Sequence, residues 1–243
     1  MHRREFLKAA LTAGSLLLLS RYTTQLAEAF KLAIEGEVKV LWLQGAGDSG
    51  CTISFLQGAH PDLVDVVTQF RLAVAFHPTI MVPQGEDALK PLKDVVEGLT
   101  RLDLLIVEGA VPEGAYCSLG EVEGKPIPFE WWVRKLGEKA ETILALGDCA
   151  TTGGISAASP NPARCRPVRE VLPGKRVVSL TGCPPHPEWI TITLAALLSG
   201  ETLELDEYGR PKLFYSHYIH DLCPRRGFYD RGEFAERLSL IHI

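Results

Sequence analysis

The sequence lacks the motifs of nucleotide-dependent enzymes and the charge pattern of nucleic-acid-binding proteins. It contains neither a G-x-G-x-x-G fingerprint nor a P-loop. Lys and Arg are scattered along the chain and the formal net charge is -5, so no basic stripe is available for a phosphate backbone. These absences argue against a nucleotide cofactor and against a nucleic-acid partner.

Cysteine is sparse. A chain of 243 residues with 6 cysteines is not a small disulfide-rich secreted domain. The thiols are therefore either inert core residues or a set of metal ligands that the fold assembles. They are widely spaced, at Cys51, Cys117, Cys149, Cys165, Cys183 and Cys223.

The N-terminal region has no apolar run long enough to cross a bilayer, since the uncharged stretch 9–20 is well short of roughly 20 residues. Arg3 and Arg4 precede this stretch, and residues 27–29 form a small-x-small cleavage candidate. This layout predicts a twin-arginine export signal over residues 1–29 and a periplasmic protein. The alternative is an amphipathic N-terminal helix. Twin-arginine export carries folded proteins, so a cofactor can be inserted in the cytoplasm and the thiols can remain ligands.

After Gly36, short apolar runs alternate with helical patterns. We predict strands at 38–44, 102–109, 142–149 and 176–183, and helices at 63–70, 129–140 and 189–198. Apolar strands separated by helices predict an α/β fold, in which an open parallel sheet carries helices on both faces.

Three glycine-containing loops, each with one cysteine, follow three of these strands: GAGDSGC, GDCATTGG and TGCPPHP. The carboxyl ends of parallel strands share one edge of the sheet, so Cys51, Cys149 and Cys183 are expected to converge there. The glycines allow close backbone approach and offer N–H groups to inorganic sulfides. Any one of these cysteines alone would be interpreted as a small buried hydrophobe. Three at equivalent strand ends predict a cluster site.

Asp48 stands three residues before Cys51, where a second thiolate would complete a C-x-x-C pair. A cubane cluster needs four ligands, and a carboxylate oxygen binds iron, although it is a harder ligand than thiolate. Asp48 is therefore a candidate fourth ligand. The alternatives are a helix-capping aspartate and an iron left open to water.

Long, chemically unusual stretches resemble the small, electron-transferring subunit of [NiFe] hydrogenases, and the resemblance runs from the N-terminal signal almost to the end of the chain. They include WLQGAGDSGCTISFL, HPTIM, LIVEGAVP, ALGDCATTGGISAASPNPA, TGCPPHPEWI and RPKLFYSHYIHDLCPRRGFYDRGEFA. The resemblance implies a flavodoxin-like domain over residues 36–200 with a proximal [4Fe–4S] cluster. The matching ligand positions are Asp48, Cys51, Cys149 and Cys183.

The resemblance also implies an incomplete C-terminal cluster region over residues 201–243. His220 and Cys223, in IHDLCPRR, match two ligands of the family's distal [4Fe–4S] cluster. The other distal ligands and those of the medial cluster are expected downstream of Ile243, so we expect a partial chain.

Asp48 departs from the family pattern, which has cysteine there, and predicts a three-Cys, one-Asp cluster with an altered potential. Oxygen-tolerant relatives add two cysteines around a modified [4Fe–3S] cluster. Gly50 and Gly154 occupy those positions here, so that modified cluster is not expected.

By resemblance, the chain is the small subunit of an uptake hydrogenase. A large subunit would split H2, and electrons would leave through the clusters to an acceptor such as a cytochrome b or c. Membrane association through a longer C-terminus or a partner is compatible with this function.

The alternatives are an H2-sensing regulatory subunit, which the export signal disfavours, and a degenerate scaffold without redox activity. A related quinone-oxidoreductase subunit has adjacent cysteines, which this chain lacks.

Five further residues have simpler interpretations. Cys117 is expected to be a buried thiol and Cys165 an incidental loop thiol. Glu108 is interpreted as a solvated or hydrogen-bonding loop carboxylate, and Trp42 as a core residue. His186 either tunes a cluster through a hydrogen bond or is an ordinary loop histidine.

Overall fold

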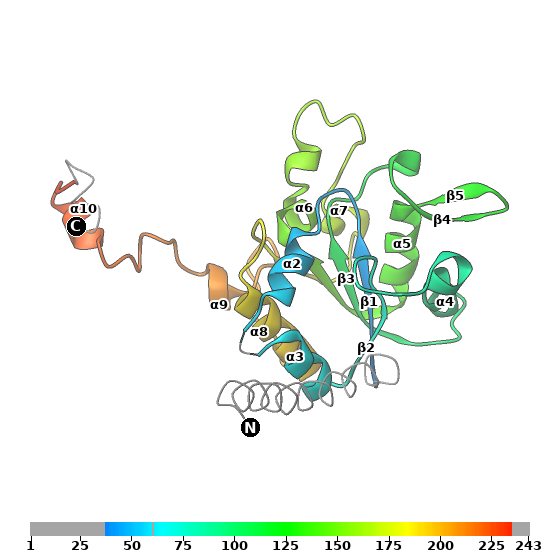
Figure 1. Ribbon diagram of the computed structural model, residues 1–243. Helices are drawn as coiled ribbons and strands as arrows, with labels where there is room; N and C mark the ends of the chain where they lie inside the picture. The colour runs from blue at the N-terminus through cyan, green and yellow to red at the C-terminus, as the bar shows by residue number, and fades with distance from the viewer. Residues whose placement is uncertain (1–36, 60, 235–243) are drawn as a thin grey trace, which may run out of the picture.

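The computed structural model describes residues 37–59 and 61–234, so the predicted export signal lies outside the described residues (Figure 1). Its main sheet has the strand order β2-β1-β3-β6-β7, and every neighbouring pair is parallel. The strands are β1 (Val38–Gln44), β2 (Leu72–Phe76), β3 (Leu102–Glu108), β6 (Ala140–Leu146) and β7 (Val177–Leu180).

The sheet is buried on both faces, which explains why its strands are nearly continuous apolar runs. Side chains alternate across a strand, so β1 supplies both sides of the core. Leu41 and Leu43 belong to one buried cluster, whereas Val40 and Trp42 belong to the other.

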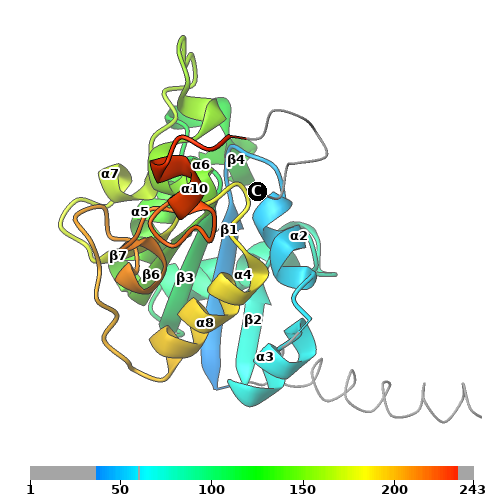
Figure 2. The same ribbon diagram turned by 90° about the vertical axis from the view of Figure 1, so that its left-hand side faces the viewer.

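Helices cover both faces (Figures 1 and 2). The first cluster includes side chains from α4 (Gly85–Val96), α5 (Phe129–Lys139) and α7 (Val168–Val171). The second includes side chains from α2 (Gly50–Leu56), α3 (Leu63–Gln69) and α8 (Pro187–Leu198). The predicted open parallel sheet between two helical layers is confirmed.

The sheet order places β1 between β2 and β3, as in flavodoxin-like folds. Counted along the main sheet, the strands run 2-1-3-4-5, and the order reverses between β1 and β3. In open α/β sheets ligands bind outside the carboxyl ends of the strands at such a switch point. The fold therefore marks the loops after β1 and β3 as the place for a functional site.

Several boundaries differ from the prediction. The predicted strand 142–149 was wrong at its carboxyl end, because β6 stops at Leu146 and α6 (Gly147–Thr152) begins there. Gly147 has φ +86 and Gly109 has φ +85, a conformation that favours glycine and breaks a strand. Strands β3 and β6 accordingly end at the residues before these glycines.

Some elements were not predicted from the sequence. They include β2, α4, an antiparallel hairpin of β4 (Ser118–Val122) and β5 (Lys125–Pro128), the short helix α7, and the short 3-10 turns Gly114–Tyr116 and Ile155–Ala157. β2 is a run of five residues, too short for periodicity to distinguish a strand from a helix.

The chain after α8 first returns to the edge of the sheet. The backbone N–H of Ser179 in β7 donates to the carbonyl of Gly209 at 2.8 Å. In α9 (Lys212–Tyr215), Phe214 stacks on Trp189 with a ring-centroid distance of 4.9 Å. This stretch is thus packed onto the sheet domain.

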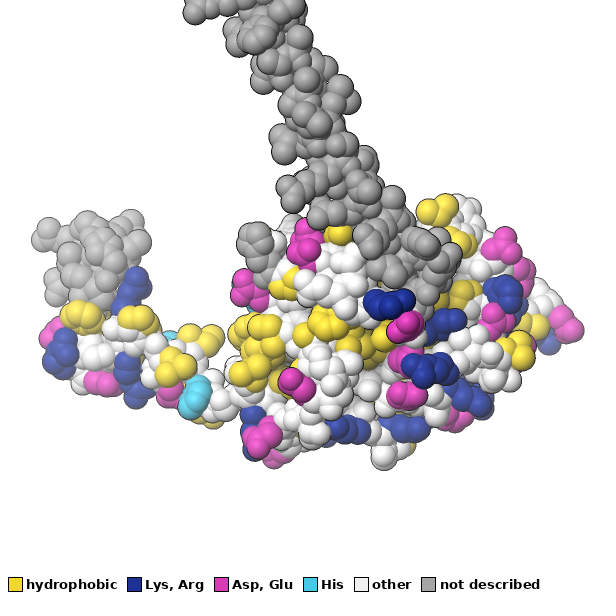
Figure 3. All heavy atoms as spheres, turned by 90° about the horizontal axis from the view of Figure 1, so that it is seen from below, with side chains coloured by type: hydrophobic (Ala, Val, Ile, Leu, Met, Phe, Trp, Pro, Cys, Tyr) yellow, Lys and Arg dark blue, Asp and Glu magenta, His cyan; other side chains and the backbone are white. Residues whose placement is uncertain are grey.

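Beyond α9 the chain leaves the sheet domain, and the described residues continue through α10 (Arg226–Asp230) to residue 234 (Figure 1). Figure 3 shows this segment as a separate lobe with acidic, basic and histidine side chains. Among residues 37–59 and 61–234, no helix has the length and apolar character needed to span a bilayer.

Candidate metal-cluster site

The structure brings the four predicted proximal ligands to one cavity at the carboxyl edge of the sheet. Asp48 is exposed in the loop after β1, and Cys51 is buried in the first turn of α2. Cys149 lies in α6, and Cys183 is exposed in the loop after β7. All four line a space of about 370 Å³ between these loops. The predicted convergence of the three thiols is confirmed.

Two glycines make room for the thiols. A Cβ atom added at Gly147 would overlap the Sγ atom of Cys51. A Cβ atom added at Gly154 would lie 2.8 Å from the Sγ atom of Cys149. Any larger residue at these positions would displace a thiol, so the backbone is shaped around the two sulfur atoms.

The donor set fits an iron–sulfur cluster. Thiolates are the usual ligands of such clusters, and three thiols border the cavity together with the carboxylates of Asp48, Glu108 and Asp148. Within the described part of the chain, no three His, Cys, Asp or Glu residues are grouped closely enough to hold a single metal ion. The four predicted ligands border one space between the loops.

Burial and negative neighbours raise the pKa values of Cys51 and Cys149 and so favour their protonated thiols in the absence of metal. Burial raises the pKa of Cys51, and the charges of Glu108 and Asp48 raise it further. Burial also raises the pKa of Cys149, with Cys183 and Asp48 contributing. Cationic iron would reverse this balance by replacing the thiol protons.

Asp48 also shapes the ligand loop. Its Oδ1 atom accepts a hydrogen bond from the backbone N–H of Gly50 at 2.8 Å, and Ser49 occupies the N-cap position of α2 without a side-chain cap. Asp48 thus stabilises the turn that begins α2 and also borders the cavity. The helix-capping alternative is wrong in its detail, because the N-cap residue is Ser49 and Asp48 stabilises the turn before it. The interpretation of Asp48 as a ligand stays a prediction.

Glu108 is a buried acceptor at the end of β3, so the solvated alternative of its interpretation was wrong and the hydrogen-bonding alternative is confirmed. Its side chain is 1% exposed. Oε1 accepts from the backbone N–H groups of Cys51 and Thr52, at 3.0 and 3.1 Å. Oε2 accepts from Trp42 Nε1 at 2.8 Å, from Gln44 Nε2 at 3.1 Å and from the Thr52 hydroxyl. This network could not be predicted from the sequence, because its members come from different helices and strands.

The remaining interpretations from the sequence have mixed outcomes. Trp42 is a core residue, as predicted. Cys117 is only half-buried, and Cys165 is the more buried of the two, at 5% exposed. His186 is the N-cap residue of α8, and its Nδ1 atom accepts from the backbone N–H of Glu188 at 3.3 Å. Its side chain therefore caps the N-terminus of α8.

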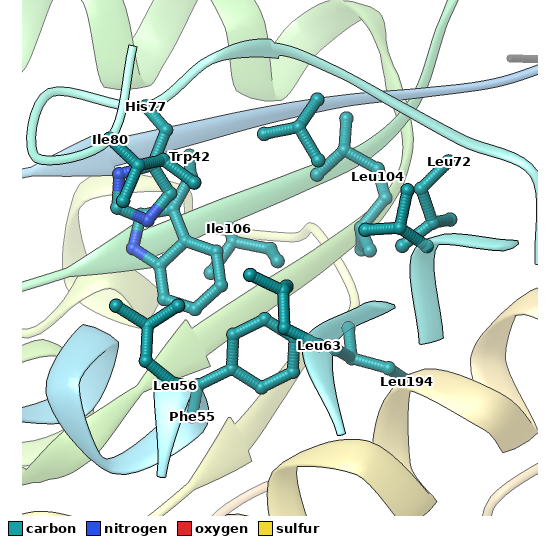
Figure 4. Close-up of a pocket in the computed structure, with 13 residues that line it drawn as sticks. Trp42, Phe55, Leu56, Leu63, Leu72, His77, Ile80, Leu104, Ile106 and Leu194 are labelled. Carbon is teal, nitrogen blue, oxygen red and sulfur yellow. The ribbon is translucent and has the colours of Figure 1, made fainter. Parts of the chain in front are cut away.

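A second pocket lies on the α2, α3 and α8 side of the sheet (Figure 4). Its lining is almost entirely apolar, and Trp42 and His77 are the residues with polar ring atoms. A small-molecule site normally adds several convergent polar groups to an apolar wall. We interpret this pocket as loosely packed core.

His220 and Cys223 lie together in the C-terminal lobe. They line one pocket with Arg225, Arg226 and Tyr229, and the backbone N–H of Cys223 donates to the carbonyl of His220 at 3.4 Å. Arg226 pairs with Asp230 at 2.7 Å. The pocket brings together the two residues predicted as distal ligands, and a cubane cluster needs about four such ligands.

The fold and the site together define a class: a flavodoxin-like domain with a thiol-lined cavity at its switch point. Comparison with known proteins places the chain within this class. Residues 49–197 match the family described as NADH ubiquinone oxidoreductase, 20 Kd subunit. The chain is 38% identical over 239 residues to the uptake hydrogenase small subunit of Afipia carboxidovorans, covering 96% of this chain and 63% of that protein.

In two further comparisons, the chain covers a larger share of the related protein. The chain is 35% identical over 261 residues to the periplasmic [NiFeSe] hydrogenase small subunit of Desulfomicrobium baculatum, covering 98% of this chain and 82% of that one. A crystal structure of the reduced, active Ni-Fe-Se hydrogenase from Desulfomicrobium baculatum superposes with a TM-score of 0.75 and 35% identity, covering 82% of this chain and 78% of that one. The chain belongs to the family of [NiFe] hydrogenase small subunits.

Proposed function

We propose that this chain is the electron-transfer subunit of a [NiFe] uptake hydrogenase. The observation that carries the proposal is the meeting of Asp48, Cys51, Cys149 and Cys183 around one cavity in a chain of this family. These four residues would hold a proximal [4Fe–4S] cluster, which when bound accepts and returns single electrons. The chain spans 63% of the length of the Afipia carboxidovorans relative, so the activity of the whole protein is part of the proposal.

The protein's own contribution is rigid placement of the ligands. Cys51 is held in the first turn of α2, whose backbone N–H groups are anchored on buried Glu108. Hydrogen bonds to groups beside a metal ligand fix the orientation of that ligand and tune the metal. Electron transfer at this site requires no acid–base pair, and none is assigned.

Partners and location follow from the family and from the N-terminal pattern. A large subunit would oxidise H2 and deliver electrons to the proximal cluster. His220 and Cys223 would be part of a distal cluster that passes electrons to an acceptor such as a cytochrome b or c. The twin-arginine pattern before residue 30 supports export to the periplasm, where the [NiFeSe] relative is located according to its name.

The proposal is tested by iron and sulfide analysis and by EPR on the chain co-expressed with its large subunit. We expect about four irons for the proximal site. Cys149→Ser should lose most of this iron, whereas Cys117→Ser, a matched change at a thiol away from the cavity, should retain it. Wild-type protein without iron would contradict the proposal and would support the scaffold alternative.

The role of Asp48 is tested by two substitutions. Asp48→Asn retains an oxygen for the Gly50 N–H and so preserves the turn, but it removes the anionic ligand. Asp48→Cys supplies a thiolate instead. If Asp48 binds iron, both substitutions change the EPR signal of the cluster. If it only forms the turn, Asp48→Asn leaves the signal as in the wild type.

A further inference from the structure

Asp148 joins two of the ligand loops. Its backbone N–H donates to the carbonyl of Gly182 at 2.8 Å, and its Oδ1 atom accepts from the backbone N–H of Gly182 at 2.9 Å. Asp148 immediately precedes Cys149, and Gly182 immediately precedes Cys183. This reciprocal pair of hydrogen bonds therefore connects the two ligand loops one residue away from their thiols.

The loop that carries Cys183 depends on such contacts because it is irregular and partly exposed. Gly182 has φ +145, and a Cβ atom there would lie 2.7 Å from the Cα atom of Pro185. Two other side chains hold the loop further from the thiol. The hydroxyl of Tyr215 donates to the carbonyl of Thr181 at 2.6 Å, and the hydroxyl of Ser54 donates to the carbonyl of Pro185 at 2.7 Å. The Ser54 bond ties this loop to α2, which carries Cys51, and the Asp148 pair ties it to α6 at the residue next to Cys149.

Asp148 also places a negative charge at the cavity. Its side chain is half-buried and lines the cavity together with Asp48 and Glu108. Within the described ranges Asp148 forms no salt bridge, and its side-chain hydrogen bond is the one to the Gly182 N–H. Negative charge beside a cluster disfavours the addition of an electron, and local charge is one of the factors that set cluster potentials.

We propose that Asp148 is a positioning residue that locks the Cys149 and Cys183 loops together, and that its charge lowers the reduction potential of the cluster. The proposal rests on the proposed function, because it requires a cluster in the cavity. The two contributions are separable. The hydrogen bond needs an oxygen at Oδ1, whereas the potential depends on the charge of the carboxylate.

Two substitutions separate them in the chain co-expressed with its large subunit. Asp148→Asn retains an oxygen acceptor for the Gly182 N–H and removes the charge. We expect iron per chain as in the wild type and a reduction potential shifted upward in an EPR-monitored titration. Asp148→Ala removes the acceptor as well. We expect iron retention against a chelator to weaken by about 10-fold or more, the range seen for such supporting contacts.

Asp87→Asn provides the control, because Asp87 is an exposed residue of α4 that does not line the cavity. It should change neither iron retention nor potential. An unchanged potential in Asp148→Asn, or wild-type iron retention in Asp148→Ala, overturns the proposal while leaving the proposed function intact. Absence of iron in the wild type overturns the proposed function, and this inference with it.

Discussion

The carboxylate of Glu108 accepts a hydrogen bond from the backbone N–H of Cys51 at 3.0 Å, and both residues are buried. Glu108 ends β3, and Cys51 lies in the first turn of α2. The bond therefore spans the switch point of the sheet and fixes the start of α2 to its edge. A buried carboxylate needs several donors to offset its desolvation, and this one has them.

Replacing Glu108 with Gln should destabilise the protein. The amide nitrogen would face N–H and O–H donors that now meet an oxygen, and each buried donor left without an acceptor costs about 1–3 kcal/mol. We expect a lower midpoint of thermal unfolding and reduced iron per chain. Glu113→Gln is the matched control, since Glu113 is half exposed and pairs with exposed Arg164. Equal midpoints for the two variants would contradict this account of the network.

Replacing Gly147 with Ala should displace the Cys51 thiol. The added Cβ atom would overlap Sγ, and φ +86 adds about 1–2 kcal/mol of backbone strain. Gly174→Ala, at φ +79, carries the same kind of strain, but nothing lies within 4 Å of its added Cβ atom. We expect both variants to lose stability and only Gly147→Ala to lose iron. Iron lost equally from both would show that strain alone is responsible.

His77 should make stability depend on pH. Its side chain is 3% exposed, and burial lowers its pKa from 6.5 to about 4, although nearby Glu108 opposes the shift. Between these values the unfolded chain binds a proton that the folded chain excludes, so stability falls as pH falls from 6.5 to 4. This difference between the two pKa values corresponds to a loss of up to about 3 kcal/mol in the free energy of unfolding.

The measurement is the midpoint of urea unfolding between pH 7 and pH 4. His77→Gln does not titrate and should show a smaller loss of stability over this range than the wild type. His217→Gln changes an exposed histidine of the C-terminal segment and should follow the wild-type profile. If the unfolding midpoint of His77→Gln depends on pH as in the wild type, groups other than His77 cause the acid sensitivity.

Removing the Tyr215 hydroxyl should loosen the attachment of α9. The hydroxyl donates to the carbonyl of Thr181 at 2.6 Å, and burial raises the pKa of Tyr215 to about 12, so this donor persists at all ordinary pH values. Tyr215→Phe keeps the ring packing against Trp189 and should cost about 1 kcal/mol. We expect faster proteolytic cleavage after α8. Tyr218→Phe, at an exposed tyrosine, should not change the cleavage rate.

The strands and the cysteine-containing loops that follow them could be located from the sequence alone. The strands are recognisable as apolar runs because both faces of the sheet are buried, and the loops after three of these runs carry Cys51, Cys149 and Cys183. Parallel pairing then requires these loops to share an edge. The cavity residues were therefore predictable from local patterns and one topological rule.

The strand order and the hydrogen bonds that support the site depend on the tertiary structure. The short run of β2 was missed, and without it the strand order shows no switch point. Glu108 lies 57 residues from Cys51, and Asp148 lies 34 residues from Gly182. Hydrogen bonds over such separations leave no periodicity in the sequence. They form only after packing has excluded water from the strand ends, and this is why the supporting network of the site emerged from the fold alone.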